Sequence, residues 1–105
     1  MRKTYSMILY NVTVKIENNS RIDWLKWMKE VHIPEVLGTG LFEEYKLCHI
    51  LQDDPEGETY AIQYFCKDME TFQQYQQEFA PKLQAEHQDR YKNKYVAFRT
   101  LMQVL

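Results

Sequence analysis

The sequence lacks the features that mark several common classes of protein. It has no run of lysine or arginine, and its 13 basic residues are offset by 15 acidic ones, so no nucleic-acid partner is expected. No apolar stretch approaches membrane-span length, so no membrane partner is expected. Basic Arg2 and Lys3 are followed by strand-like alternation instead of a signal-peptide core. These absences favour a globular domain that works in an aqueous compartment.

Cysteine and histidine are also scarce. The two cysteines, Cys48 and Cys66, have no CxxC spacing, and they do not face each other across the hairpin expected around Pro55. We therefore expect free thiols in a reducing, cytoplasmic environment. Three scattered histidines do not make a zinc signature, so no metal site is expected.

The chain also lacks internal repeats, low-complexity segments and linkers. A length of 105 residues is enough for one hydrophobic core. We expect a short tail at residues 1–6, followed by a single domain over residues 7–105.

What the chain does have is a regular succession of strand patterns. Period-two alternation with β-branched residues over residues 7–17 predicts a first strand. Residues 41–52 and 59–66 predict a hairpin, because the Asp-Asp-Pro-Glu-Gly segment between them is a strong turn signal. Residues 95–105 predict the fourth strand.

Two helical regions separate these strands. An amphipathic pattern beginning at Ser20 predicts a first helix that ends near His32, because Pro34 disfavours helical angles at Ile33. A short extra turn should follow. In the second region Pro81 interrupts the helical pattern, which predicts two helices over residues 69–79 and 81–91.

The order of elements predicts the fold class and an open sheet face. The succession β-α-β-β-α-β is the ferredoxin-like split pattern of an α+β sandwich, with a four-stranded antiparallel sheet, adjacent first and last strands, and helices on one face. Alternation assigns these residues to the open face: Met7, Leu9, Asn11, Thr13, Tyr45, Leu47, His49, Ala61, Gln63, Phe65, Tyr95, Arg99, Leu101 and Gln103. This face is too apolar for solvent and too polar for a dry core. We therefore expect a homodimer through the sheet face, with a lumen between the sheets.

Several segments together resemble a known family. These are MILYNVTVKI, WLKWMKEVHIPEVL, YAIQYF, the alanine-proline break in the later helical region, and YVAFRTL. From residue 7 onward the chain closely resembles an uncharacterised bacterial family known only as a domain of unknown function. The resemblance implies the dimeric α/β-barrel fold of antibiotic-biosynthesis monooxygenases, haem-degrading monooxygenases, muconolactone isomerases and polyketide cyclases. It implies no activity, because a fold does not define a function.

The resemblance also bears on cofactors. Haem-degrading relatives use an Asn on the first strand, with a Trp and a His in the later helical region. Asn11 matches in kind and His87 lies in the corresponding region, but no Trp follows residue 27. We expect no cofactor.

Three polar residues expected within strands are the main candidates for ligand binding. Asn11, Gln63 and Arg99 need partners, because an unpaired buried polar group costs about 1–3 kcal/mol. Three interpretations are open. The residues bond to one another across the sheet or the dimer, they bind an anionic or carbonyl-bearing ligand with the planar guanidinium of Arg99 receiving a carboxylate, or they are simply exposed to solvent. Tyr45, expected on the same face, joins them as a candidate contact.

The histidines are the candidate catalytic residues. His32, His49 and His87 each have an ordinary pKa near neutrality and are candidate general bases on a phenolic or enolisable substrate. His32 has two interpretations: a helix-end residue packed against the core, or a pocket-edge acid or base. No Ser-His-Asp or Cys-His spacing is visible.

The sequence leaves open whether the protein is an enzyme. The leading hypothesis is a small cytoplasmic homodimer that binds a small organic ligand or has a structural, accessory role. The alternative is a cofactor-independent enzyme of monooxygenase, isomerase or cyclase type, acting on a hydrophobic oxo or hydroxy compound in the barrel lumen.

Overall fold

The architecture follows the order of elements expected from the sequence. The structure is a computed structural model that describes residues 7–105, so the tail expected at residues 1–6 lies outside the described residues. The elements are β1 (Ile8–Glu17), α1 (Arg21–Trp27), α2 (Ile33–Gly38), β2 (Glu44–Ile50), β3 (Gly57–Cys66), α3 (Met69–Glu78), α4 (Ala80–Arg90) and β4 (Tyr95–Gln103). This order confirms the ferredoxin-like α+β fold.

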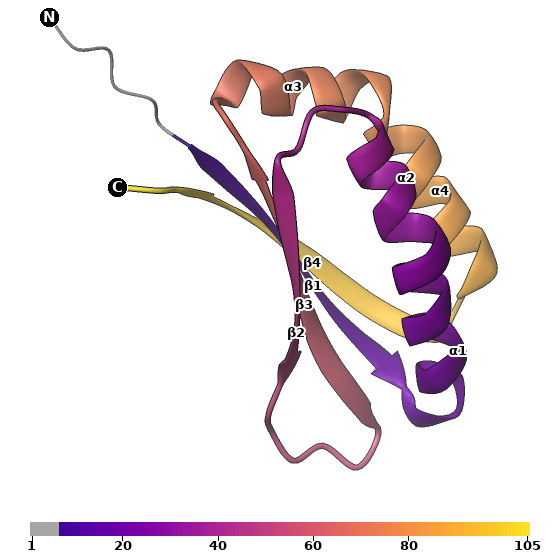
Figure 1. The fold of residues 1–105 in the computed structure, drawn as a ribbon. Helices are drawn as coiled ribbons and strands as arrows, with labels where there is room; N and C mark the ends of the chain where they lie inside the picture. Colours follow the sequence, from indigo (N-terminus) through magenta and orange to yellow (C-terminus); the bar gives the residue numbers. More distant parts are fainter. Residues whose placement is uncertain (1–6) are drawn as a thin grey trace, which may run out of the picture.

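The four strands form one antiparallel sheet in the order β2-β3-β1-β4. The first and last strands are neighbours, as expected, with β1 inside the sheet and β4 at its edge. All four helices cover the same face of the sheet, and no described element covers the other (Figure 1). The fold therefore has two layers and an open sheet face.

The hydrophobic core lies between the sheet and the helices. Trp24, Ile16 and Ile62 are at most 1% exposed within it. An aromatic cluster fills one end, where Tyr10 lies 5.0 Å from Phe72 between ring centroids. At the other end the Tyr91 hydroxyl donates a hydrogen bond to Asp23 at 2.7 Å, and this bond holds the end of α4 against α1.

The first helical region differs from the expectation in one respect. Ile33 keeps helical angles (φ −60°, ψ −45°), so the expectation that Pro34 moves Ile33 out of the helical region is wrong. The boundary expected near His32 is present, because one helical segment ends at His32 and the short helix α2 begins at Ile33. A π-helical turn over Met28–His32 joins α1 to α2. Pro34 lacks a backbone N–H, and the wider turn accommodates it in the first turn of α2 without ending the helical path. The break expected at Pro81 is confirmed, since α3 ends at Glu78 and α4 begins at Ala80.

The pairing registers correct the face assigned to β4. Arg99 pairs with Val12, Leu101 with Tyr10 and Tyr95 with Ile16, and directly paired residues share a face. Tyr95, Arg99, Leu101 and Gln103 therefore lie on the helix-covered face, opposite to the expectation. The open face of β4 instead carries Val96, Phe98, Thr100 and Met102.

The same argument corrects β2. Tyr45 pairs with Tyr64, Leu47 with Ile62 and His49 with Tyr60, so Tyr45, Leu47 and His49 also lie on the helix side. The assignments on β1 and β3 are confirmed. Asn11 pairs with Gln63 and Thr13 with Ala61 on the open face.

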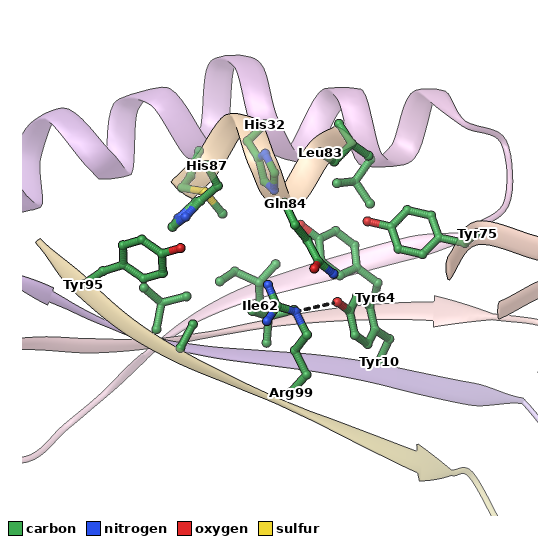
Figure 2. A pocket seen from close by; sticks show the side chains of 15 residues that line it. Tyr10, His32, Ile62, Tyr64, Tyr75, Leu83, Gln84, His87, Tyr95 and Arg99 are labelled. Atoms are coloured by element: carbon green, nitrogen blue, oxygen red, sulfur yellow. Dashed lines mark hydrogen bonds between the residues drawn. The ribbon is translucent and has the colours of Figure 1, made fainter. Parts of the chain in front are cut away.

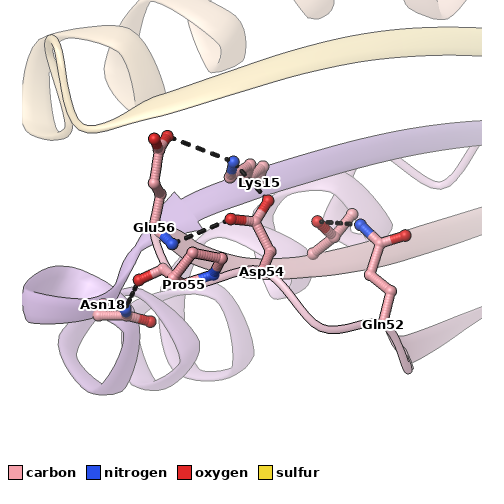
Figure 3. Close-up of polar contacts among 7 residues, drawn as sticks. Lys15, Asn18, Gln52, Asp54, Pro55 and Glu56 are labelled. Carbon is pink, nitrogen blue, oxygen red and sulfur yellow. Dashed lines mark hydrogen bonds and ion pairs between the residues drawn. The ribbon is translucent and has the colours of Figure 1, made fainter.

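The β2–β3 hairpin loop is fastened to neighbouring elements by polar contacts. Lys15 on β1 forms an ion pair with Asp54 at 2.6 Å, and Asp54 accepts a hydrogen bond from the backbone N–H of Glu56 (Figure 3). The side-chain amide of Asn18 donates to the carbonyl oxygen of Pro55 at 3.0 Å. These contacts hold the hairpin loop against β1 and the residue that follows it, although the loop is distant from them in sequence.

Two simpler features complete the fold. Cys48 lies exposed and Cys66 buried, both as free thiols. Within residues 7–105, no helix is both long enough and apolar enough to cross a membrane.

Replacing Gly57 with alanine should destabilise the fold. A Cβ atom there would clash with the backbone oxygen of Ile16, and the backbone of a paired strand cannot easily move away. We expect Gly57→Ala to lower the free energy of unfolding by about 1–3 kcal/mol in urea denaturation. The control is Gly38→Ala, because a Cβ at Gly38 meets nothing within 4 Å. An unchanged midpoint for Gly57→Ala would contradict the close approach of β3 to β1.

Candidate functional site

A polar pocket lies between the helices and the covered face of the sheet. Its inner chamber, with a volume of about 30 Å³, is reached by side chains from β1, β3, β4 and the helical segments above. An outer groove of about 310 Å³ adjoins it. Tyr10, Tyr75, Gln84 and Arg99 line both spaces and form the neck between them.

Arg99 supplies the positive charge of this pocket. It rises from β4 toward the helices, and its Nε donates a hydrogen bond to the Tyr10 hydroxyl at 3.0 Å (Figure 2). No aspartate or glutamate lines the chamber or the groove in the described part of the chain. The guanidinium therefore keeps its terminal N–H groups for another acceptor.

His87 is held in the chamber by a hydrogen bond from Trp24. The indole Nε1–H donates to Nε2 of His87 at 2.9 Å, and both residues are buried. Because α4 begins at the Pro81 break, one face of this helix carries Leu83 and His87 into the chamber. Burial first, and then the charges of His32 and Arg99, lower the pKa of His87 to about 4.

His32 lies beside His87, with ring centroids 5.7 Å apart. The π-helical turn carries His32, whose ring stacks on Trp27 at 5.0 Å. Its Nδ1 atom is buried and has no hydrogen-bond partner within residues 7–105. Burial, with a smaller contribution from Arg99, lowers the pKa of His32 to about 4. Both histidines are therefore neutral at pH 7.

Three tyrosines that line the chamber are held in their protonated form. Burial is the main cause that raises the pKa of Tyr64, Tyr75 and Tyr95. The pocket at pH 7 thus combines one uncompensated cation with neutral hydroxyl, amide and imidazole groups. Such a site suits a ligand with an oxyanion or a polarised carbonyl.

The structure brings together only some of the predicted site residues. His32, His87 and Arg99 share the chamber. Asn11 and Gln63 lie across the sheet from Arg99 on the open face, so the predicted set of Asn11, Gln63 and Arg99 is divided between two faces. The amide of Asn11 donates to the hydroxyl of Thr13 at 2.9 Å.

The other two candidates lie outside the chamber. His49 stacks on Tyr60 at 4.7 Å and contacts the Glu58 carboxylate at 2.9 Å, near the hairpin end of β2. Tyr45 is 40% exposed on the same edge strand. Neither residue lines the chamber or the groove.

No site role was proposed from the sequence for Tyr10, Trp24, Tyr75 or Gln84. Tyr75 and Tyr10 were visible as core-facing positions of amphipathic elements. Trp24 and His87 are 63 positions apart, and nothing in the local sequence indicates that they are in contact.

Solved structures share this architecture at low sequence identity. A dimeric ferredoxin-like protein from an uncultured marine organism matches with a TM-score of 0.58 and 14% identity, over 95% of this chain and 96% of that one. SnoaB, a cofactor-independent oxygenase from Streptomyces nogalater, matches with a TM-score of 0.69 and 9% identity, over 95% and 94%. A conserved protein of unknown function from Bacteroides thetaiotaomicron matches with a TM-score of 0.68 and 14% identity, over 96% and 100%. At these identities the matches define the ferredoxin-like fold.

The family is defined by sequence. Residues 7–105 match the family described as Domain of unknown function (DUF4286), and the chain belongs to it. None of the curated proteins compared with the chain matches it. The resemblance noted in the sequence is therefore confirmed, and the function has to be argued from the pocket.

The free energy of unfolding should decrease as the pH is lowered, because the two buried histidines then become protonated. Their pKa of about 4 in the folded state lies below the ordinary value near 6.5, so the unfolded chain takes up protons first as the pH falls. The stabilisation is fully present above pH 6.5 and is lost between pH 6.5 and 4. Each histidine contributes at most about 1.4 kcal/mol per pH unit across that window. Urea denaturation at several pH values, with imidazole NMR titration, measures both effects. Titration of either ring near pH 6.5 would contradict the burial described here.

Proposed function

We propose that the protein binds a small organic molecule, bearing an oxyanion or carbonyl group, in the pocket between its helices and its sheet. The observation that carries this proposal is the uncompensated guanidinium of Arg99 at the neck of the pocket. The Arg99 side chain is exposed to solvent and no described carboxylate lines the pocket, so its terminal N–H groups are accessible to an anion that enters there. Arginine also offers two parallel N–H donors that fit a carboxylate.

The groove suits the remainder of such a ligand. Its volume of about 310 Å³ lies at the lower end of the range of small-molecule sites. Phe72, Ala80 and Leu101 give it apolar walls beside the polar neck. A compound with one polar head and a compact apolar body matches this division.

The open sheet face supports a homodimer as the working unit. Val96, Phe98 and Met102 are 67%, 63% and 39% exposed there, on an edge strand beside β1. A contiguous apolar surface of this kind is normally covered by a partner, and a second copy gives a closed two-fold assembly. The similar marine protein is described as dimeric. The two free thiols favour a cytoplasmic location for this homodimer.

A second candidate function is catalysis without a cofactor. The specific observation is that His32 and His87, both with pKa values of about 4, adjoin Arg99 in one chamber. His32 has a ring nitrogen, Nδ1, without a partner within residues 7–105, and in the tautomer that carries the proton on Nε2 this nitrogen can accept a proton from an enolisable or phenolic substrate. Arg99 would stabilise the resulting oxyanion.

Ligand binding should raise the thermal midpoint in a manner that depends on Arg99. We expect a hit from a screen of aromatic acids, phenols, acyl compounds and haem at pH 7. A ligand at about 100 times its Kd adds about 2.7 kcal/mol, which shifts the midpoint by several degrees. The shift should disappear in folded Arg99→Ala and persist in Arg21→Ala, which removes an arginine that lines neither space. No shift with any compound, with Arg99→Ala merely melting lower, would indicate a structural role for Arg99.

Disrupting the open face should separate the dimer. A charge at Phe98 would be buried against the partner's sheet, so Phe98→Glu should yield a monomer in sedimentation equilibrium. The matched control is Ile22→Glu on α1, where the side chain is 75% exposed on the helical side. A wild-type chain that sediments as a monomer at micromolar concentration would contradict the homodimer.

A further inference from the structure

The hydrogen bond between Trp24 and His87 fixes which nitrogen of His87 carries the proton. An indole N–H donates and never accepts, so Nε2 of His87, 2.9 Å away, accepts the bond through its lone pair. In a neutral imidazole the proton then resides on Nδ1. Trp24 (0% exposed) and His87 (8% exposed) are both buried, so this contact lies within the core.

The other protonation states of His87 conflict with this contact. With the proton on Nε2, two N–H donors would face each other at 2.9 Å in the core. A doubly protonated ring has the same conflict and adds a buried cation near Arg99. The pKa of about 4, lowered mainly by burial, agrees with a neutral ring.

The hydrogen bond with Trp24 occupies Nε2 of His87, so the Nδ1–H group remains available to a ligand in the chamber. The same chamber receives the guanidinium of Arg99, and no carboxylate lines it within residues 7–105. Two hydrogen-bond donors, His87 on α4 and Arg99 on β4, thus line the same small chamber. A volume of about 30 Å³ admits one or two groups the size of water, such as the oxygens of a carboxylate.

We propose that His87 is a hydrogen-bond donor to the ligand, that Trp24 is the positioning residue that sets its tautomer, and that the ligand presents a carboxylate to His87 and Arg99. The inference rests on the proposed binding function and names the ligand class. The carboxylate enters the chamber, and the apolar body lies in the groove along Phe72 and Leu101. His32, whose Nδ1 has no partner within residues 7–105, lines the same chamber.

Nitrogen-15 NMR of the histidine rings tests the tautomer without any ligand. At pH 7 wild-type His87 should show a protonated, pyrrole-type Nδ1 and an unprotonated, pyridine-type Nε2. Trp24→Phe removes the donor and should give a mixture with the Nε2–H form. A wild-type spectrum with the proton on Nε2 would overturn the inference while leaving the proposed binding function intact. The wild-type spectrum decides this point even if Trp24→Phe fails to fold.

Paired ligands and paired variants test the oxyanion. Benzoate should bind at least about tenfold more tightly than benzamide, its neutral isostere, because a charge-assisted bond is the stronger one. His87→Asn keeps an amide donor near the position of Nδ1 and should retain most benzoate binding. His87→Gln keeps an acceptor for Trp24 but loses that donor, and it should bind benzoate at least about fivefold more weakly.

The outcomes separate this inference from the proposed function. Equal binding of benzoate and benzamide would overturn the carboxylate as the ligand class, and equal binding of benzoate by the two His87 variants would overturn the donor role. Binding of other compounds in the screen with none of benzoate would overturn the ligand class alone. The absence of any binder would remove the proposed function itself.

Discussion

The pairing register of β4 against β1 is the constraint on which the pocket depends. Val12 lies opposite Arg99, and this pairing directs the guanidinium toward the helices. A shift of one residue would turn every side chain of β4 to the other face. Arg99 would then leave Tyr10, and Val96 and Phe98 would enter the core. The register also gives the open face its exposed apolar residues, so the candidate site and the proposed dimer surface have one structural origin.

The helical layer completes the site because two prolines interrupt regular helix geometry. Pro34 is accommodated by the π-helical turn that carries His32, and Pro81 starts α4, which carries His87. The two histidines come from different helical segments and meet over the sheet at 5.7 Å between ring centroids. Arg99 lies below them, lowers the pKa of both rings and hydrogen-bonds to Tyr10. The result is a chamber in which one cation, Arg99, lies beside uncharged imidazole, hydroxyl and amide groups.

The local sequence pattern predicted the helices and strands well, but it assigned the side chains of β2 and β4 to the wrong faces of the sheet. The fold class, the break at Pro81 and the faces of β1 and β3 followed from period and turn chemistry. On β4 both faces are apolar, with Val96 and Phe98 on one side and Ala97 and Leu101 on the other, so alternation could not decide which side meets the helices. Arg99 was therefore identified as a candidate but placed on the wrong face. The tautomer of His87 depends on Trp24, 63 positions away, and only the three-dimensional packing brings them together.

The central claim is that the ligand binds on the helix side of the sheet, and mapping of NMR chemical-shift perturbations tests this claim most directly. Benzoate titrated into labelled wild-type protein should shift the Nε–H signal of Arg99 and the ring signals of His32 and His87. The side-chain amide signals of Asn11 and Gln63, on the open face, should remain unchanged in the same spectra. Perturbation of Asn11 and Gln63 with Arg99 unaffected would place the binding site on the open face of the sheet and contradict this account.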